Sequence, residues 1–111
     1  MTALPVDAPP LDLVALRAHA GEAVALRKVL GNEDRLMLLC QIAQQPRTVG
    51  ELEQLTGISQ PTLSQQLGVL RREGLVSTER EGKFIRYQAT DARALQLMQL
   101  VHQLFCEGAH A

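Results

Sequence analysis

The stretch from Thr48 to Glu73 constrains the fold most, because it carries the signals that start and end two short helices. Thr48-Val49-Gly50-Glu51 has the form of a capping box, in which the hydroxyl and the carboxylate each satisfy a backbone N–H group. Gly57 can adopt the left-handed conformation that ends a helix, and Ser59 can cap a second helix that tolerates Pro61 in its first turn. The predicted structure is a helix to Thr56, a tight turn, and a helix from about Gln60 to Glu73.

Two longer helices are predicted before this pair. Apolar residues recur at spacings near three and four from Leu11 to Leu30, and again from Leu36 to Ala43, as they do on the buried face of a helix. Gly31 separates the two segments, and Asn32 is a good N-cap for the second one. The second helix should stop near Gln45-Pro46.

After Gly74 the pattern changes to short strands and then returns to a helix. Residues 75–80 and 84–88 are typical of two strands joined at 81–83, which predicts a β-hairpin, or wing. A last helix should begin at Asp91 as its N-cap and continue through Phe105. Its apolar stripe is broader than one contact requires, so part of it is expected to meet a partner.

Composition agrees with one mainly helical domain. Aromatic residues make up only 3% of the chain and tryptophan is absent, so the core must be built from Leu, Val, Ile and Ala. A chain of 111 residues is long enough for one core and too short for two ordinary domains. We expect a flexible Pro-rich tail at residues 1–10, a winged helix-turn-helix domain of about five helices plus a two-stranded wing at 11–107, and a short tail at 108–111.

The sequence also indicates where the protein acts. Its apolar runs are much shorter than the roughly 20 residues that cross a bilayer, and its first residues lack the basic and apolar segments of a secretory signal. We therefore expect a cytoplasmic protein that does not enter a membrane.

Charge supports DNA binding only through its distribution, because the formal net charge of the whole chain is −1. Between Gln60 and Gln88, five basic residues stand against three acidic ones, a local net charge of +2. Taken singly, each basic residue could equally be a solvated surface charge. In a helix-turn-helix, the second helix lies in the major groove, where uncharged Gln, Ser and Thr side chains can pair with bases, while Arg and Lys neutralise phosphates. The predicted DNA-binding residues are Gln60, Thr62, Ser64, Gln65, Gln66, Arg71, Arg72, Lys83 and Arg86.

Three segments carry a resemblance to the ArsR/SmtB repressors, a family of bacterial regulators. They are Val49-Gly50-Glu51-Leu52, Ser59-Gln60-Pro61-Thr62-Leu63-Ser64-Gln65-Gln66-Leu67 and Leu70-Arg71-Arg72-Glu73-Gly74-Leu75-Val76. The segment from Leu30 to Leu36 is also similar to the family's helix-opening segment. The similarity spans most of residues 24–106. It implies a homodimer built on the first and last helices, bound to double-stranded operator DNA with inverted-repeat symmetry, and no enzymatic activity.

Cys40 and Cys106 stand 66 positions apart and are the candidates for chemistry. A single isolated Cys is most often a small buried core residue. One Cys in the second helix and one in the last resembles the pattern of the biofilm growth-associated branch of the family. That resemblance implies a sensor of reactive sulfur species or oxidants, in which the two thiols become joined by a disulfide or polysulfide bridge. Sequence alone does not fix the pKa or reactivity of either thiol.

Metal sensing is a second possible function. The family's metal sensors use Cys on the third helix, where this chain has none, or Asp and His on the last helix, where Asp91 and Glu107 match but Arg93 and Leu104 replace His. A guanidinium cannot ligate a cation, so we expect no metal and no cofactor. His102 and Cys106 lie four residues apart and could chelate only with further ligands. The paired thiols would also suit a dithiol redox enzyme, and the fold would suit a winged-helix interaction module without DNA affinity.

Overall fold

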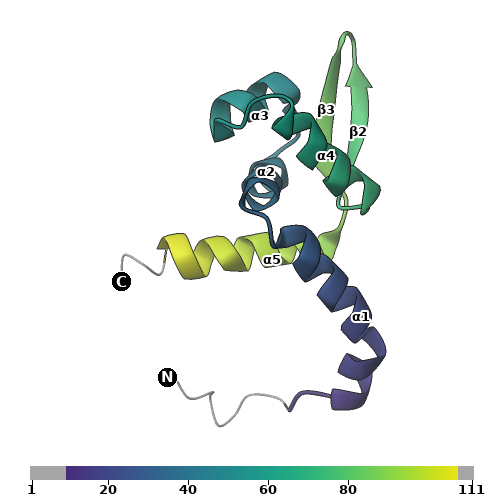
Figure 1. Cartoon of the computed structure of the whole chain (residues 1–111). Helices are drawn as coiled ribbons and strands as arrows, with labels where there is room; N and C mark the ends of the chain where they lie inside the picture. Colours follow the sequence, from purple (N-terminus) through teal and green to yellow (C-terminus); the bar gives the residue numbers. More distant parts are fainter. Residues whose placement is uncertain (1–9, 108–111) are drawn as a thin grey trace.

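The computed structural model describes residues 10–107, so most of the N-terminal tail expected at 1–10 and all of the tail expected at 108–111 lie outside the described residues. The described residues form five α-helices and a small sheet, whose β2–β3 hairpin projects from one end of the molecule in Figure 1. In chain order the elements are α1 (Leu13–Leu30), α2 (Glu33–Gln44), β1 (Arg47–Thr48), α3 (Val49–Thr56), α4 (Thr62–Arg72), β2 (Val76–Glu81), β3 (Phe84–Ala89), α5 (Ala92–His102) and a π-helical turn, η1 (Gln103–Glu107).

Side-chain caps start the helices where the sequence predicts them. The Asn32 side chain accepts a hydrogen bond from a backbone N–H of α2, and the Asp91 carboxylate accepts two from α5. Thr48 and Glu51 form the predicted capping box at the start of α3. Gly57 ends α3 with a φ of 75°, in the left-handed region that glycine adopts without strain.

The start of α4 differs from the prediction. The helix begins at Thr62 rather than Gln60, and the predicted cap Ser59 contributes its backbone carbonyl to Leu63 rather than its side chain. Pro61 occupies the N-cap position and has no side-chain acceptor, so the Gln60 side-chain oxygen instead accepts the Ser64 N–H at 3.2 Å.

The sheet has three strands instead of the two expected for the wing. Strands β2 and β3 pair as the predicted antiparallel hairpin, with Gly82 at a φ of 62° in its turn. The additional strand β1 pairs with the other side of β3, which gives the order β1-β3-β2. A strand of two residues is too short to leave a periodic pattern in the sequence.

The core is a cluster of aliphatic side chains gathered around α2, which lies at the centre of the molecule (Figure 1). Leu63, Leu67 and Leu70 of α4 are at most 1% exposed, as predicted. Burying each leucine contributes about 1.5–3 kcal/mol, so these three fix which face of α4 looks outward. Within residues 10–107, no helix combines the length and apolar character needed to span a bilayer.

The outline is more extended than that of a typical single domain. Its radius of gyration is 16.3 Å, whereas about 13 Å is usual for 100 residues. Figure 1 shows why: α1 and the C-terminal end of α5 both project away from the body. These two parts carry many exposed large apolar side chains, namely Leu13, Val14, Leu16, Val24, Leu100, Leu104 and Phe105.

Candidate DNA interface and thiol site

The outward face of α4 carries most of the uncharged residues predicted to read bases. Ser64 and Gln65 are exposed on the helix, Gln60 is exposed just before it, and Thr62 and Gln66 are half-buried. Because three leucines hold one face of α4 in the core, Ser64 and Gln65 face solvent, whereas Thr62 and Gln66 flank the buried face. The arrangement provides hydroxyl and amide groups of the kind that pair with base edges.

Two of the three glutamines already have protein partners. The oxygen of Gln60 accepts the Ser64 N–H, and the oxygen of Gln66 accepts a hydrogen bond of 2.8 Å from Nη1 of Arg35. Arg35 lies on α2 and was not among the predicted site residues. It stands in the segment Leu30–Leu36, which resembles the family, but its contact partner is 31 residues away in the sequence.

The predicted phosphate contacts Arg71, Arg72 and Lys83 are exposed around α4 and the wing. Arg71 and Arg72 form the last turn of α4, and Lys83 follows Gly82 at the wing tip. Nζ of Lys83 lies 5.8 Å from the centroid of the Phe84 ring, within the range of a cation–π contact. These positions would allow the three cations to contact the phosphate backbone of a DNA duplex that runs past α4 and the wing.

Arg86 has a different environment from the other predicted cations. Its guanidinium donates to the Glu81 carboxylate within the wing and, at 3.4 Å, to the Glu51 carboxylate of α3. The hydrogen bond from the backbone N–H of Thr48 is the main cause of the lowered pKa of Glu51, and the positive charge of Arg86 lowers that pKa further. Arg86 therefore joins the wing to α3, and its charge is largely offset by two carboxylates.

Both cysteines are free thiols and line one apolar groove of about 630 Å³ between α1, α2 and the end of α5. Cys40 is half-buried on α2, and Cys106 is exposed on η1. The fold thus brings together two thiols that are 66 positions apart in the sequence. Arg27 and Met37 line the same groove.

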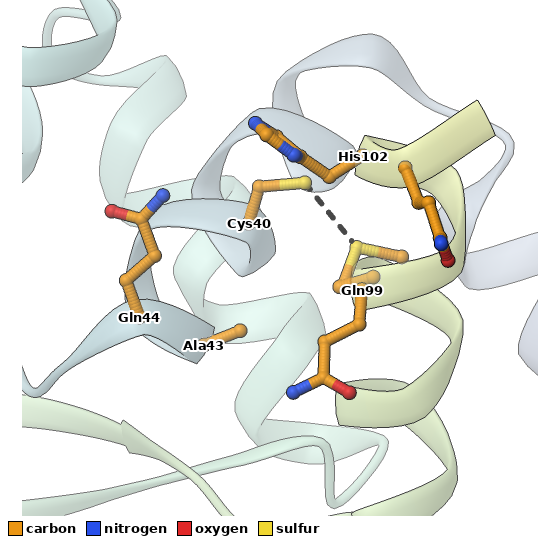
Figure 2. Close-up of a pocket in the computed structure, with 7 residues that line it drawn as sticks. Cys40, Ala43, Gln44, Gln99 and His102 are labelled. Carbon is orange, nitrogen blue, oxygen red and sulfur yellow. Dashed lines mark hydrogen bonds between the residues drawn. The ribbon is translucent and has the colours of Figure 1, made fainter. Parts of the chain in front are cut away.

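Cys40 is packed against α5 through Met98, which was not a predicted site residue. Its Sγ donates a hydrogen bond of 3.4 Å to Sδ of Met98, drawn as the dashed line in Figure 2. Cys40 also borders a second cavity of about 460 Å³, shown in Figure 2, together with Gln44, Gln99 and His102. Burial, and next the nearby Cys106, raise the pKa of the Cys40 thiol. Cys40 is therefore kept protonated at neutral pH.

The residues weighed as metal ligands on the last helix are used differently. Asp91 caps α5 and forms an ion pair with Arg93, in which Nη2 of Arg93 lies 3.1 Å from Oδ2 of Asp91. Nη1 of Arg93 lies 3.0 Å from Oε2 of Glu22 on α1. The hydrogen bond from Arg93 is the main cause that lowers the pKa of Asp91. Among residues 10–107, no three His, Cys, Asp or Glu side chains gather as a metal site would require.

Comparison with known proteins identifies the family. Residues 32–78 match the profile described as "Bacterial regulatory protein, arsR family". The chain is 45% identical to the biofilm growth-associated repressor of Agrobacterium fabrum over 102 residues, which cover 92% of this chain and 87% of that protein. The chain belongs to the ArsR family. The resemblance noted in the sequence, including its branch, is thereby confirmed.

Solved structures of ArsR-family regulators share the fold. The chain matches the crystal structure of the transcriptional repressor BigR from Xylella fastidiosa with a TM-score of 0.83 and 46% identity, covering 86% of this chain and 98% of that one. It matches reduced HlyU from Vibrio cholerae with a TM-score of 0.78 and 36% identity, covering 83% and 97%. The winged helix-turn-helix prediction is therefore confirmed, with one strand more than expected.

Proposed function

We propose that this ArsR-family protein is a homodimeric repressor whose binding to operator DNA is released when Cys40 and Cys106 become bridged. The observation that carries the proposal is the single groove into which both thiols open. The similar proteins include repressors, BigR among them, and one relative solved in a reduced form, which supports a regulator with redox chemistry.

DNA binding would use the outward face of α4 in the major groove and the wing beside it. Thr62, Ser64 and Gln65 are available for bases, while Arg71, Arg72 and Lys83 would contact phosphates. Gln60 and Gln66 would approach bases with side chains already fixed within the protein. Arg86, also predicted to contact DNA, would instead hold the wing in place.

Dimerisation would cover the apolar side chains that α1 and α5 expose. An isolated monomer would leave this surface in water, and exposed apolar patches of this kind usually mark interfaces. The extended outline agrees, because helices that project from the body leave surface that a second copy can cover. A two-fold dimer in the cytoplasm would present two α4 helices to successive major grooves, about 34 Å apart, on an inverted repeat.

The exposed Cys106 is suited to react first with the inducer. Its thiolate would attack the sulfane sulfur of a persulfide RSSH, forming Cys106–S–SH and releasing RS⁻. Cys40, after losing its proton, would then attack Sγ of Cys106, forming a disulfide and expelling HS⁻. With one additional sulfur atom on Cys106, attack by Cys40 on the inner added sulfur would give a trisulfide and again expel HS⁻. A direct disulfide requires Cα atoms within about 7 Å, and inserted sulfur relaxes that limit.

Bridging would act on DNA binding through α2. This helix carries Cys40 and packs against α4 as well as α5. A covalent bridge between Cys40 and Cys106 would therefore change the position of α2 relative to α4, the helix proposed to contact bases. Since half-site spacing is fixed, a small shift of two α4 helices weakens binding. The sensor reacts stoichiometrically, so peroxide or persulfide should not be turned over repeatedly in the presence of a thiol reductant, as an enzyme would do.

Two measurements test the proposal. Nuclease protection with DNA from upstream of the chain's own coding sequence should show a symmetric site whose affinity falls as salt rises. Equal affinity for shuffled DNA at every salt concentration would contradict specific binding. Mass spectrometry after persulfide treatment should find one cross-linked peptide pair containing Cys40 and Cys106. Modification confined to one thiol would contradict the bridge, and a matched peroxide treatment separates sulfur transfer from oxidation.

A further inference from the structure

Arg35 lies where three helices meet. Its Nε donates to the backbone carbonyl of Val29, and its Nη2 donates to that of Lys28 at 3.3 Å. Both carbonyls belong to the last turn of α1, and that of Lys28 also accepts the backbone N–H of Gly31 at 3.3 Å. A cation at this end of a helix is also favoured by the helix dipole. Two nitrogens of the guanidinium are therefore held by the end of α1.

The remaining nitrogen of Arg35 fixes the orientation of Gln66. Nη1 lies 2.8 Å from Oε1 of Gln66 on α4. A guanidinium only donates hydrogen bonds, so the amide oxygen, and not the amide nitrogen, must face it. The group that Gln66 then turns toward another partner is its NH₂, which is a donor.

This restriction changes what Gln66 can recognise. A glutamine pairs with adenine in bidentate fashion by offering its oxygen to N6 and its nitrogen to N7. Gln65, one residue earlier and exposed, keeps both groups for such a pair. Oε1 of Gln66 is already turned toward Arg35, so the edge that Gln66 offers to a base is led by its NH₂ group. That group can donate to both acceptors of guanine, O6 and N7, whereas adenine offers it only N7 beside a donor at N6, and thymine offers only O4.

We propose that Arg35 is a specificity-determining residue: by holding the oxygen of Gln66, it makes this side chain favour guanine over adenine. The inference rests on the proposed binding of α4 in the major groove. It assigns different base preferences to two identical neighbouring side chains, Gln65 and Gln66.

Binding-site selection from a randomised inverted-repeat library tests this with the full chain. In the Gln66→Ala variant, the operator position that Gln66 reads should lose its base preference, which identifies that position. Wild type should select guanine there and disfavour adenine by about tenfold. Arg35→Met should reduce that discrimination below about threefold by freeing the amide oxygen, while the position that Gln65→Ala identifies stays unchanged. Selection of adenine by wild type at the Gln66 position, or an unchanged preference in Arg35→Met, would overturn the proposal.

A second variant keeps the test independent of folding, since Arg35 also caps α1. Gln66→Glu retains an oxygen for Arg35 but replaces the donor with a second acceptor, so the preference at that position should move to cytosine, whose N4 donates. Retained preference for guanine would refute the role of the amide donor. If Gln66→Ala alters no position, Gln66 does not read bases and the inference fails. If wild type selects no sequence at all, the proposed DNA-binding function itself fails.

Discussion

Leu104→Ala should weaken the proposed homodimer substantially while leaving the fold of each subunit intact. Leu104 is 60% exposed on η1, beyond α5, so a partner that covers it would remove most of its side chain from water. Complete burial of a leucine is worth about 1.5–3 kcal/mol, and the exposed share corresponds to about 1–2 kcal/mol. Two copies per dimer give about 2–4 kcal/mol, which is roughly a 30- to 1000-fold increase in the dimer Kd.

Sedimentation equilibrium over a range of protein concentrations measures this change. Leu55→Ala is the matched control, because Leu55 is 49% exposed on α3, away from the helices proposed to dimerise. Its dimer Kd should equal that of wild type, and thermal melting of both variants should show little change, as is usual at exposed sites. If both variants dimerise as tightly as wild type, the apolar end of the chain is not the interface.

The remaining predictions concern DNA contacts and acid stability. Lys83→Ala should weaken binding to all sequences and lower the slope of log affinity against log salt by about 1.8, because each of two wings loses one phosphate contact; an unchanged slope removes Lys83 from the contacts. Gln65→Ala should cost about 1–3 kcal/mol on the operator in an anisotropy titration and little on random DNA, whereas equal losses on both would refute base reading. Arg93 lowers the pKa of Asp91 below its ordinary value of 3.8 in the folded chain, so this stabilisation is present above about pH 4 and is lost as pH falls further. Asp91→Asn keeps an N-cap but does not titrate, so its melting temperature should fall less than that of wild type below about pH 4; parallel curves would contradict this linkage.

The sequence was sufficient for features that depend on neighbours in the chain. Asn32, Thr48, Gly57 and Asp91 act within a few residues of their own positions, and each has the capping or turn role predicted for it. The leucines of α4 recur with helical periodicity and are buried as expected. Local backbone chemistry and periodic burial are the signals that a single sequence expresses most clearly.

Features that depend on distant contacts were not predictable in the same way. Strand β1 exists because Arg47 and Thr48 pair with β3, almost forty residues later. The bonds of Arg86 to Glu51 and of Arg35 to Gln66 join residues more than thirty positions apart. The sequence predicted Arg86 and Gln66 as DNA contacts, but only the packing of α2, α3 and the wing decides which residues they bind within the protein.

The fold likewise brought the thiols to one groove, while the sequence alone left their separation and environment open. The resemblance to the biofilm growth-associated branch made the pair noticeable. The structure adds that Cys40 is half-buried against Met98 with a raised pKa and that Cys106 is exposed. This difference supplies the proposed order of reaction, with Cys106 first and Cys40 second.

The most direct test of the thiol switch is operator affinity measured by fluorescence anisotropy for wild type, Cys40→Ser and Cys106→Ser, before and after polysulfide treatment. All three reduced proteins should bind alike. Treated wild type should bind about ten- to a hundredfold more weakly, as expected for a coupling of about 1–3 kcal/mol, and should recover with a reductant. Both serine variants should remain bound after treatment. Dissociation of either treated variant to the same extent as wild type would contradict a bridge between Cys40 and Cys106 as the switch.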